Sequence, residues 1–444
     1  MTRDSSRQLH LNVNVFLQGF AQAAWRAPEL DPKGTVGLDH YLVNARIAER
    51  GKLDALFLAD SVATSTLGTG PVTALEPTIV LAALARETSH LGLIATASTT
   101  YNEPYNIARR FATLDLISQG RAGWNVVTTA DSSSAEKFGL SETPDHATRY
   151  RRADEFTRIV KGLWNSWEDD ALVADQLTGE FVDTEKLHPI HHEGEFFKVD
   201  GVLNQPRSPQ GHPVILQAGG SSDGRRLATK YAEAVFSASI SLPEATAYAN
   251  ELREGAYKAG RGKNAIKIIP GLGYFLGGTE EEAFRRHREL VAMIPLEHNL
   301  KRLAGRLGVD PSILELDKPL PEDLPLPNGG RGGHTFFNAI RARFRETGFT
   351  LREYLETFGG GGGHREVVGT PEQLADDIEQ WFKAGAADGF NLMPSLTPDG
   401  LEAFVDEVVP ILQKRGLFRT EYEGTTLRDN LGLSIPPART SDAY

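Results

Sequence analysis

The sequence predicts an α/β protein, a TIM-type (β/α)8 barrel that forms a single domain over residues 1–444 with two long insertions and a C-terminal extension. Three observations predict this fold. Short apolar strands alternate with segments of helical periodicity, eight such strands can be counted, and polar residues follow the ends of several of them. This alternation calls for parallel strands with right-handed crossovers, and such a barrel carries its active site at the carboxyl ends of its strands.

The first half of the chain contains four of the expected strand and helix pairs. The strands are short, rich in apolar or β-branched residues and bounded by turn residues, and we expect them at 11–17, 53–58, 91–99 and 121–129. The helices show helical periodicity, and we expect them at 39–50, 76–89, 104–117 and 149–164. Gly51 ends the first helix and Pro77 lies in the first turn of the second, both at positions that suit those residue types.

The second half repeats the pattern with two interruptions. Further strands are expected at 213–217, 234–238, 265–275 and 389–393, and further helices at 225–232, 243–259, 371–383 and 401–414. The insertion at about 167–212 is rich in turn residues and predicts a β-hairpin. The insertion at about 295–368 contains proline-rich text and two glycine clusters, and we expect it to form a mobile lid with helices at 336–345 and 351–358.

Composition excludes several classes of function. The formal net charge of −12 repels nucleic acid and anionic membranes at long range. The chain has no cysteine, so disulfides, thiolate metal sites and cysteine nucleophiles are excluded. The N-terminus lacks the apolar stretch of a signal peptide and no later segment approaches a membrane span, so we expect a cytoplasmic protein.

Polar residues at the expected strand ends are the first candidates for a site. Asp60, Thr96, Asn125 and Ser221 follow four different strands, which a barrel would bring to one face. The segment GGSSDGRR at 219–226 combines small residues with a helix N-terminus, an arrangement that favours phosphate binding. From the residues alone, ordinary capping of that helix by Ser221 or by Asp223 is the favoured explanation.

The sequence offers only weak candidates for a metal-binding or a nucleotide-binding motif. His188, His191 and His192 lie in the expected hairpin rather than at helical spacing, and no second histidine pair or carboxylate completes a set, so we predict no metal site. No dinucleotide-binding fingerprint or intact P-loop follows a strand anywhere in the chain. A redox enzyme with this sequence would therefore receive its electrons from another protein.

Five stretches of sequence, in this order, carry a family resemblance. They are RGKLDALFLAD at 50–60, TTYNEPYNIARRFATLD at 99–115 with SQGRAGWNVVTT following at 118–129, HATRYRRADEF at 146–156, SPQGHPVILQAGGSSDGRRLA at 208–228, and VVGTPEQLADDIEQWF at 367–382 through GAADGFNL at 385–392 to VDEVVPILQKRGLFRTEY at 405–422. Together they resemble the reduced-flavin-dependent monooxygenases of the bacterial luciferase-like superfamily. The resemblance is strongest to the branch that includes nitrilotriacetate, pristinamycin and dibenzothiophene-sulfone monooxygenases.

The resemblance implies a two-component enzyme in which a separate NAD(P)H:FMN oxidoreductase supplies reduced FMN. Dioxygen is the co-substrate and reacts with reduced FMN to give a flavin C4a-peroxide, which oxidises a small organic molecule with loss of a C–S or C–N bond. The first insertion, at about 167–212, looks most like that of family members that act on organosulfur compounds. Dimers or tetramers are usual among the members of the family. By position, the residues implied to contact FMN are Asp60, Thr96, Asn125, His146, Tyr150 and Ser221.

Candidates for the substrate side are fewer. Phe16, Trp25, Phe57 and Phe236 are candidates for an apolar wall, and ordinary core packing is the alternative for each. His298 is a candidate acid, base or substrate contact. Gln22 occupies a position where several relatives have a histidine, and a glutamine can form hydrogen bonds but cannot donate a proton near neutral pH.

Three other functions remain open at this point. The first is a monooxygenase that acts on an aminopolycarboxylate or another xenobiotic. The second is a flavin-binding protein without catalysis. The third is a deazaflavin-dependent reductase, which would share the barrel but lack the SQGRAGWNVVTT and HATRY segments that this chain contains.

Overall fold

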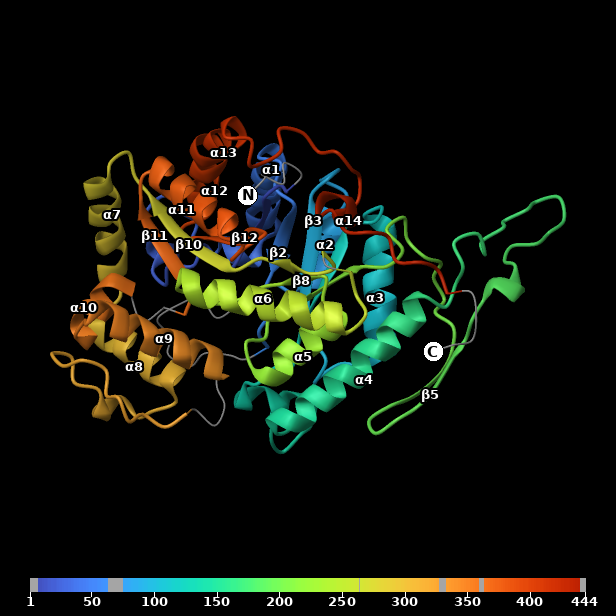
Figure 1. The fold of residues 1–444 in the computed structure, drawn as a ribbon, viewed down its shortest axis with the longest axis horizontal. Coiled ribbons are helices and arrows are strands. Elements are labelled where there is room, and N and C mark those ends of the chain that lie inside the picture. The colour runs from blue at the N-terminus through green and yellow to red at the C-terminus, as the bar shows by residue number, and fades with distance from the viewer. Residues whose placement is uncertain (1–6, 63–74, 263, 327–332, 359–362, 440–444) are drawn as a thin grey trace.

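The computed structural model describes residues 7–62, 75–262, 264–326, 333–358 and 363–439 (Figure 1). Within these residues one parallel sheet contains ten strands in the order β11-β10-β12-β1-β2-β3-β4-β7-β8-β9. Their bounds are β1 His10–Asn14, β2 Ala55–Leu58, β3 Gly92–Ser98, β4 Ala122–Val127, β7 Val214–Gln217, β8 Ala234–Val235, β9 Lys267–Ile268, β10 Gly271–Leu276, β11 Arg365–Gly369 and β12 Gly389–Pro394.

The sheet closes into a barrel between β12 and the β9–β10 segment. The backbone N–H groups of Asp388 and Asn391 donate to the carbonyl oxygens of Ile268 and Pro270, at 2.7 and 3.0 Å. The predicted strand at 265–275 is thus divided into β9 and β10 at Pro270, which has no N–H to donate. Counted as one strand, β9–β10 completes the predicted ring of eight. Strand β11 was not predicted, and it pairs in parallel with β10 outside the ring.

Helices cover the outside of the barrel. They are α1 Leu38–Arg50, α2 Pro77–Leu84, α3 Pro104–Ile117, α4 His146–Trp164, α5 Ser222–Tyr231, α6 Leu242–Lys258, α7 Glu280–Ala292, α11 Pro371–Lys383, α12 Asp399–Ala403 and α13 Val409–Lys414. The largest hydrophobic cluster lies between these helices and the sheet, where Phe111, Trp124 and Phe156 are fully buried. Within the described residues, no helix has both the length and the apolar character needed to span a membrane.

The C-terminal extension closes the amino end of the barrel. Helix α14, Leu427–Asn430, contributes Leu427 and Leu431 to the cluster inside the barrel, where they join Ile94 and Leu216. The N–H of Leu427 donates to the carbonyl of Gly120 at 3.0 Å. Side chains of the C-terminal extension therefore fill the barrel interior at its amino end, and any ligand must enter at the carboxyl ends of the strands.

The segment 167–212 contains the expected antiparallel hairpin, β5 Ile190–Glu193 and β6 Lys198–Gly201, beside α4 (Figure 1). Each of its three histidines meets a different carboxylate: His188 lies 2.7 Å from Glu168, His191 2.8 Å from Asp200 and His192 2.9 Å from Glu155. In the described part of the chain no group of three or more histidine, aspartate or glutamate side chains could hold a metal ion.

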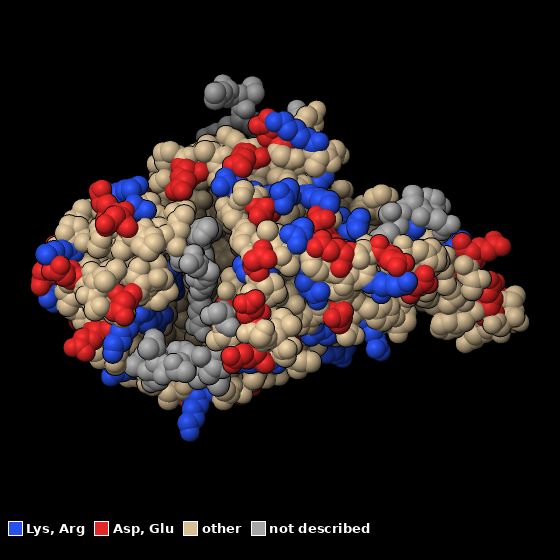
Figure 2. All heavy atoms as spheres, turned by 90° about the horizontal axis from the view of Figure 1, so that it is seen from below, with Lys and Arg blue, Asp and Glu red and all other residues tan. Residues whose placement is uncertain are grey.

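A small helical lobe follows α7. It consists of α8 Leu296–Leu307, α9 Gly333–Thr347 and α10 Leu351–Phe358, packed around a hydrophobic cluster of its own that includes Leu303, Ile340 and Tyr354. The sequence predicts α9 and α10 but neither α7 nor α8. Residues 327–332 and 359–362, which hold most of both glycine clusters, lie outside the described residues. Figure 2 shows a hollow between this lobe and the barrel, on a face where charges of both signs are interspersed.

Several ionisable side chains lie in the interior at the amino end of the barrel. Burial lowers the pKa of His212 to about 3, and the neighbouring Arg428 helps to lower the pKa of Glu233 to about 2 against the opposing effect of burial. Burial alone raises the pKa of Asp115 to about 6, although hydrogen bonds from Ser208, Ala122 and Gln210 oppose the shift. His212 is therefore neutral and Glu233 charged throughout the neutral range.

Acid is expected to destabilise the fold. Below about pH 6.5 the unfolded chain protonates His212 whereas the folded chain does not, so the free energy of unfolding falls as the pH falls toward 3. The loss of unfolding free energy due to His212 amounts to roughly 2–3 kcal/mol between pH 6.5 and 4.5. His364, with a pKa also lowered to about 3, acts in the same direction. The raised pKa of Asp115 acts in the opposite direction between about pH 6 and 4, and the two histidines outweigh it.

Urea unfolding at pH 7.0 and 4.5 measures this difference. A His212→Gln variant should lose part of the pH dependence. Equal free energies of unfolding at both pH values in the unmodified protein would contradict the expectation.

Candidate active site

The N-termini of α4 and α5 meet at the carboxyl ends of the strands and form a small polar cradle. Asp145 caps α4 by accepting from the N–H of Thr148 at 3.0 Å, and Ser221 caps α5 by accepting from the N–H of Gly224 at 3.1 Å. Tyr150 lies one turn after His146 on the same face of α4, and its hydroxyl oxygen is 3.5 Å from that of Ser221. The cradle therefore brings Tyr150 and Ser221 together.

The carboxylate of Asp223 at the start of α5 has two side-chain partners, His146 and Arg226. His146 Nδ1 lies 3.2 Å from a carboxylate oxygen of Asp223 in the first turn of α5, and the ring centroid of His146 lies 4.7 Å from that of Tyr150. Arg226 lies 2.8 Å from the other Asp223 oxygen. These two partners face the Asp223 carboxylate and weaken its repulsion of an incoming anion.

Gly219 keeps the cradle open. A Cβ atom at this position would lie 2.3 Å from Gln217 Nε2 and 3.0 Å from the Cα of Gly224, and 3.1 Å from the hydroxyl of Tyr150. Without a side chain there, a ligand can approach the hydroxyl groups and the backbone N–H groups at the start of α5. Such a helix N-terminus with two hydroxyl donors suits a phosphate group.

Thr96 and Asn125 lie side by side inside the barrel, in the matched register of β3 and β4. The side-chain amide of Asn125 donates to Thr96 Oγ1 at 2.9 Å, while its oxygen is buried and no hydrogen-bond donor within the described residues reaches it. The same holds for the side-chain oxygens of Asn12, Asn14 and Asn391. Buried acceptors of this kind usually receive a donor, so the barrel mouth suits a polar ring with N–H groups.

The remaining predicted cofactor residue and two predicted wall residues lie around the same mouth. Asp60 follows β2 and is exposed to solvent. Phe57 is buried 5.7 Å from Phe236, measured between ring centroids, and Phe236 is stacked on His364 at 5.1 Å. Gly271 makes this stack possible, because a Cβ atom there would lie 2.5 Å from the ring of His364 and 2.7 Å from that of Phe236.

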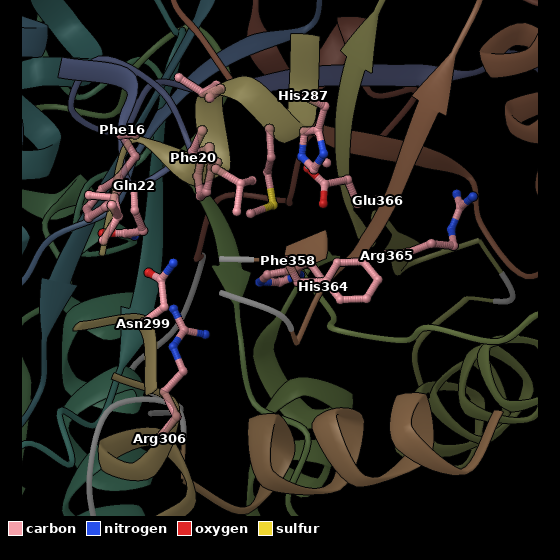
Figure 3. Close-up of a pocket in the computed structure, with 17 residues that line it drawn as sticks. Phe16, Phe20, Gln22, His287, Asn299, Arg306, Phe358, His364, Arg365 and Glu366 are labelled. Carbon is pink, nitrogen blue, oxygen red and sulfur yellow. The ribbon is translucent and has the colours of Figure 1, made fainter. Parts of the chain in front are cut away.

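A cavity of about 200 Å³ opens beside this stack, between the barrel and the helical lobe (Figure 3). Its walls come from the loop that follows β1, from β10, β11 and β12, and from α7, α8 and α10. The apolar walls include Phe16, Phe20, Leu290, Ile294, Phe358 and Met393, and the polar ones are Gln22, His287, Asn299, Arg306, His364, Arg365 and Glu366. It is thus a largely apolar pocket with a few polar groups, as is usual for small-molecule sites.

The structure brings only some of the predicted substrate residues to this cavity. Phe16 and Gln22 line it. Phe57 and Phe236 lie behind His364 rather than in the lining. Trp25 lies in the short helix Ala24–Arg26, and His298 is on α8; neither lines the cavity. Neighbouring residues on a helix point about 100° apart, so His298 turns away where Asn299 faces the cavity.

Three charged side chains are among the lining residues. Glu366 lies 3.4 Å from His287 Nε2 and 3.4 Å from the Ser395 hydroxyl, which donates to it. Arg365 contacts Asp377, and its guanidinium is stacked 3.9 Å from the centre of the Trp381 ring, away from the cavity (Figure 3). Arg306 points toward the cavity from α8. Burial, reinforced by Arg306, lowers the pKa of His364 to about 3 and keeps it neutral.

Several of these lining residues were missed in the sequence. His287, Asn299 and Arg306 belong to α7 and α8, which the sequence did not reveal, and His364 and Glu366 lie at the edge of a glycine cluster. The only local signal is the cap of α7, where Thr279 accepts from the N–H of Glu282 and acidic residues fill the first turn.

Comparisons of this chain with known proteins agree on one family. The family model described as luciferase-like monooxygenase matches residues 12–388. The N-acetyl-S-(2-succino)cysteine monooxygenase of Bacillus subtilis (strain 168) is 46% identical over 440 residues, covering 98% of this chain and 99% of that protein. Nitrilotriacetate monooxygenase component A of Aminobacter aminovorans is 43% identical over 446 residues, covering 97% and 98%. A riboflavin lyase solved with modified FMN and riboflavin superposes with a TM-score of 0.85 at 33% identity, covering 98% of each chain.

Proposed function

Because the chain belongs to the luciferase-like monooxygenase family, we propose that it is the oxygenase of a two-component system that uses reduced FMN and dioxygen to oxidise an organosulfur compound, with cleavage of a C–S bond. The observation that carries this proposal is the position of two sites at one barrel mouth. A cradle suited to a phosphate lies beside the ends of β4 and β7, and an apolar cavity lies beside the ends of β1, β10 and β12.

FMN fits the residues that are present. Tyr150, Ser221 and the first N–H groups of α5 would hold its phosphate, with His146 beside them. Asn125 and Thr96 would face the edge of the flavin ring inside the barrel, and Asp60 would lie at its outer edge. Bound reduced FMN supplies two electrons and activates dioxygen, so that one oxygen atom enters the substrate and the other leaves as water.

The residues of the cavity would hold the substrate and exclude water. Phe16, Ile294 and Met393 provide apolar contact, and we propose that the α8–α10 lobe covers the cavity as a lid. Neutral His364 and Gln22 can donate or accept hydrogen bonds but do not act as acids near neutral pH. The His287–Glu366 pair is the group in the lining that can hold a proton beside the substrate.

The relatives support the choice of substrate and of electron donor. The B. subtilis relative is named for a thioether, which favours an organosulfur compound, and we take N-acetyl-S-(2-succino)cysteine as the lead compound. The aminopolycarboxylate relative keeps cleavage of a C–N bond as the second candidate. That relative is designated component A, which supports a separate NAD(P)H:FMN oxidoreductase as the partner.

Two measurements test this function. Stopped-flow mixing of the reduced-FMN complex with dioxygen should show a transient absorbance that differs from both reduced and oxidised FMN. Coupled turnover with a flavin reductase under ¹⁸O₂ should place one labelled atom in a product of the lead compound, as read by mass spectrometry. Failure of both the transient and any labelled product, across thioethers, sulfones and aminopolycarboxylates, would overturn the proposal.

An Asn125→Leu variant tests the position of the flavin ring. The substitution removes a buried amide whose oxygen has no donor in the described structure, so the fold should change in stability by less than about 1 kcal/mol. Loss of one hydrogen bond to the ring should weaken binding of reduced FMN about tenfold. Fluorescence titration with FMN and thermal melting without it measure the two effects. Unchanged affinity would place the ring elsewhere.

A further inference from the structure

We infer that two copies of this chain associate through a two-fold interface. In this interface an arm of each copy, residues 168–187, lies in a groove between α2 and α3 of the other copy. The second copy is thus the partner that fits both surfaces. The inference concerns assembly and does not rest on the proposed function.

The arm is an ordered projection of the first insertion. Figure 1 shows it extending away from the barrel beyond the end of α4. Its two halves are hydrogen-bonded to each other. The N–H of Asp183 donates to the carbonyl of Ala171 at 2.9 Å, and the N–H of Asp175 donates to the carbonyl of Glu180 at 2.8 Å. These bonds hold the arm in one shape before a partner binds, which lowers the entropy lost on binding.

The outer part of the arm exposes large apolar side chains. Leu177 is 98% exposed and Phe181 is 69% exposed, and Leu172 and Val173 are exposed as well. Single apolar side chains on a protein surface are common and need no explanation. Four of them within ten residues form a patch, and such a patch is typical of a protein–protein contact.

The groove between α2 and α3 is a second apolar surface. It has a volume of about 590 Å³, and its apolar lining includes Ile79, Ala82, Leu114 and Ile117. Helix α2, with the sequence PTIVLAAL, contains no charged residue, yet Ile79 on its outer face is 71% exposed. A helix that is apolar on all sides is normally buried on all sides. We therefore expect the outer face of α2 to be covered when the protein assembles.

Charge favours a second copy as the partner. The chain has a formal net charge of −12, so two copies repel each other unless opposite charges meet at their contact. The arm contains seven acidic residues and one basic residue, Lys186. The charged residues that line the groove are both basic, Arg109 and Arg110. Arg110 lies 3.7 Å from Glu76, whereas Arg109 forms no ion pair with any described residue. An acidic and apolar arm therefore matches a basic and apolar groove.

The positions of the arm and the groove suit a two-fold interface. Helix α3 packs against α2 on one side, where the groove lies, and against α4 on the other side, where the arm begins. A two-fold axis beside α3 would place each arm over the groove of the other copy, so that the same contact forms twice. One interface would then cover both arms and both grooves.

Sedimentation equilibrium over a range of concentrations tests the inference, since it gives the mass and the dissociation constant of the assembly. Leu177→Ser/Phe181→Ser removes the apolar surface of the arm, and Ile79→Asp places a charge in the groove, in a first helical turn that tolerates an acid. Each variant should weaken association at least about thirtyfold. Tyr257→Asp is the matched control, because Tyr257 is an exposed aromatic residue on α6, away from both surfaces, and it should leave association unchanged.

A mixture of the arm variant and the groove variant tests whether the arm meets the groove. The mixed dimer keeps one intact contact, between the arm of the groove variant and the groove of the arm variant. The mixture should therefore associate more tightly than either variant alone.

Reversal of charge tests the pairing of acids with the basic groove. Arg109→Glu should weaken association about tenfold. Adding Glu180→Lys and Glu185→Lys, two exposed positions of the arm, should restore part of the affinity.

A monomeric unmodified protein would overturn the inference. Full association of the arm variant would overturn it too, because the groove faces would then meet without the arms. A mixture no tighter than its separate components would have the same consequence. The cradle lies at the start of α4 and the arm follows its end, so every variant should keep its affinity for FMN and its melting temperature, which shows that it is folded.

Discussion

A Tyr150→Phe/Ser221→Ala double variant is expected to bind reduced FMN at least about a hundredfold more weakly than the unmodified protein does. Its affinity for reduced riboflavin should be unchanged. The two hydroxyl groups lie 3.5 Å apart at the start of α5, where they can both donate to a phosphate. Each hydrogen bond to a charged group contributes about 1.5–3 kcal/mol, and riboflavin has no phosphate to lose them. Fluorescence titration with both flavins measures the change in preference.

Loss of the α5 cap is the competing explanation for such an effect, because Ser221 also accepts from the N–H of Gly224. Removal of a cap costs about 1 kcal/mol. Thr370→Ala is the matched control, since Thr370 caps α11 by accepting from the N–H of Gln373 at 3.3 Å and is remote in sequence from the cradle. It should lower stability similarly and leave both flavin affinities unchanged. An equal loss of FMN and riboflavin in the double variant would mean that the cradle does not bind the phosphate.

An Arg428→Met variant is expected to lose about 3–5 kcal/mol of unfolding free energy, because it leaves the charge of the largely buried Glu233 without its partner. Arg428 is 1% exposed and forms an ion pair with Glu233, and its guanidinium also donates to the carbonyls of Gln210, His212 and Ser434. It ties the C-terminal extension to the starts of β7 and β8. Urea unfolding measures the loss.

The double variant Arg428→Met/Glu233→Gln separates charge from packing. Glutamine keeps the side-chain oxygen that accepts from the N–H of Ile215 but removes the buried charge, so the double variant should recover part of the lost stability. If the single variant loses less than about 1 kcal/mol, or the second substitution adds to the loss, the buried ion pair is not what holds the extension in place.

Most strands and helices of the barrel can be predicted from the sequence. Strands such as β3 and β4 combine β-branched or apolar residues with polar ends, and helices such as α3 and α11 begin at a proline and show regular periodicity. The long ordered segments around SQGRAGWNVVTT carry the family resemblance, which the family model and the relatives confirm. The assignment of Asn125, Tyr150 and Ser221 to the flavin stays a prediction, although the structure places Tyr150 and Ser221 together.

Elements α7, α8 and β11 were missed for a physical reason. Among the strands of the described residues, β11 pairs with β10 alone, and its short segment follows a glycine cluster, so its pattern is weak in isolation. Helix α8 is stabilised by the separate cluster of the lobe, through Leu303 and Leu307, and that cluster forms only when α9 and α10 are present. Local periodicity carries little information about such elements.

Strand and helix periods follow from backbone geometry, so the sequence alone was sufficient for the fold class, the family and the polar residues at the strand ends. Only tertiary packing decides which side chains share a cavity, because its walls come from segments hundreds of residues apart, Phe16 on one side and Arg306 and His364 on the other. The same packing turns Asn299 into the cavity and His298 out of it, and directs Arg365 to Asp377 while Arg306 faces inward. Such a choice depends on the rotation of a helix against the barrel, and no local pattern records that rotation.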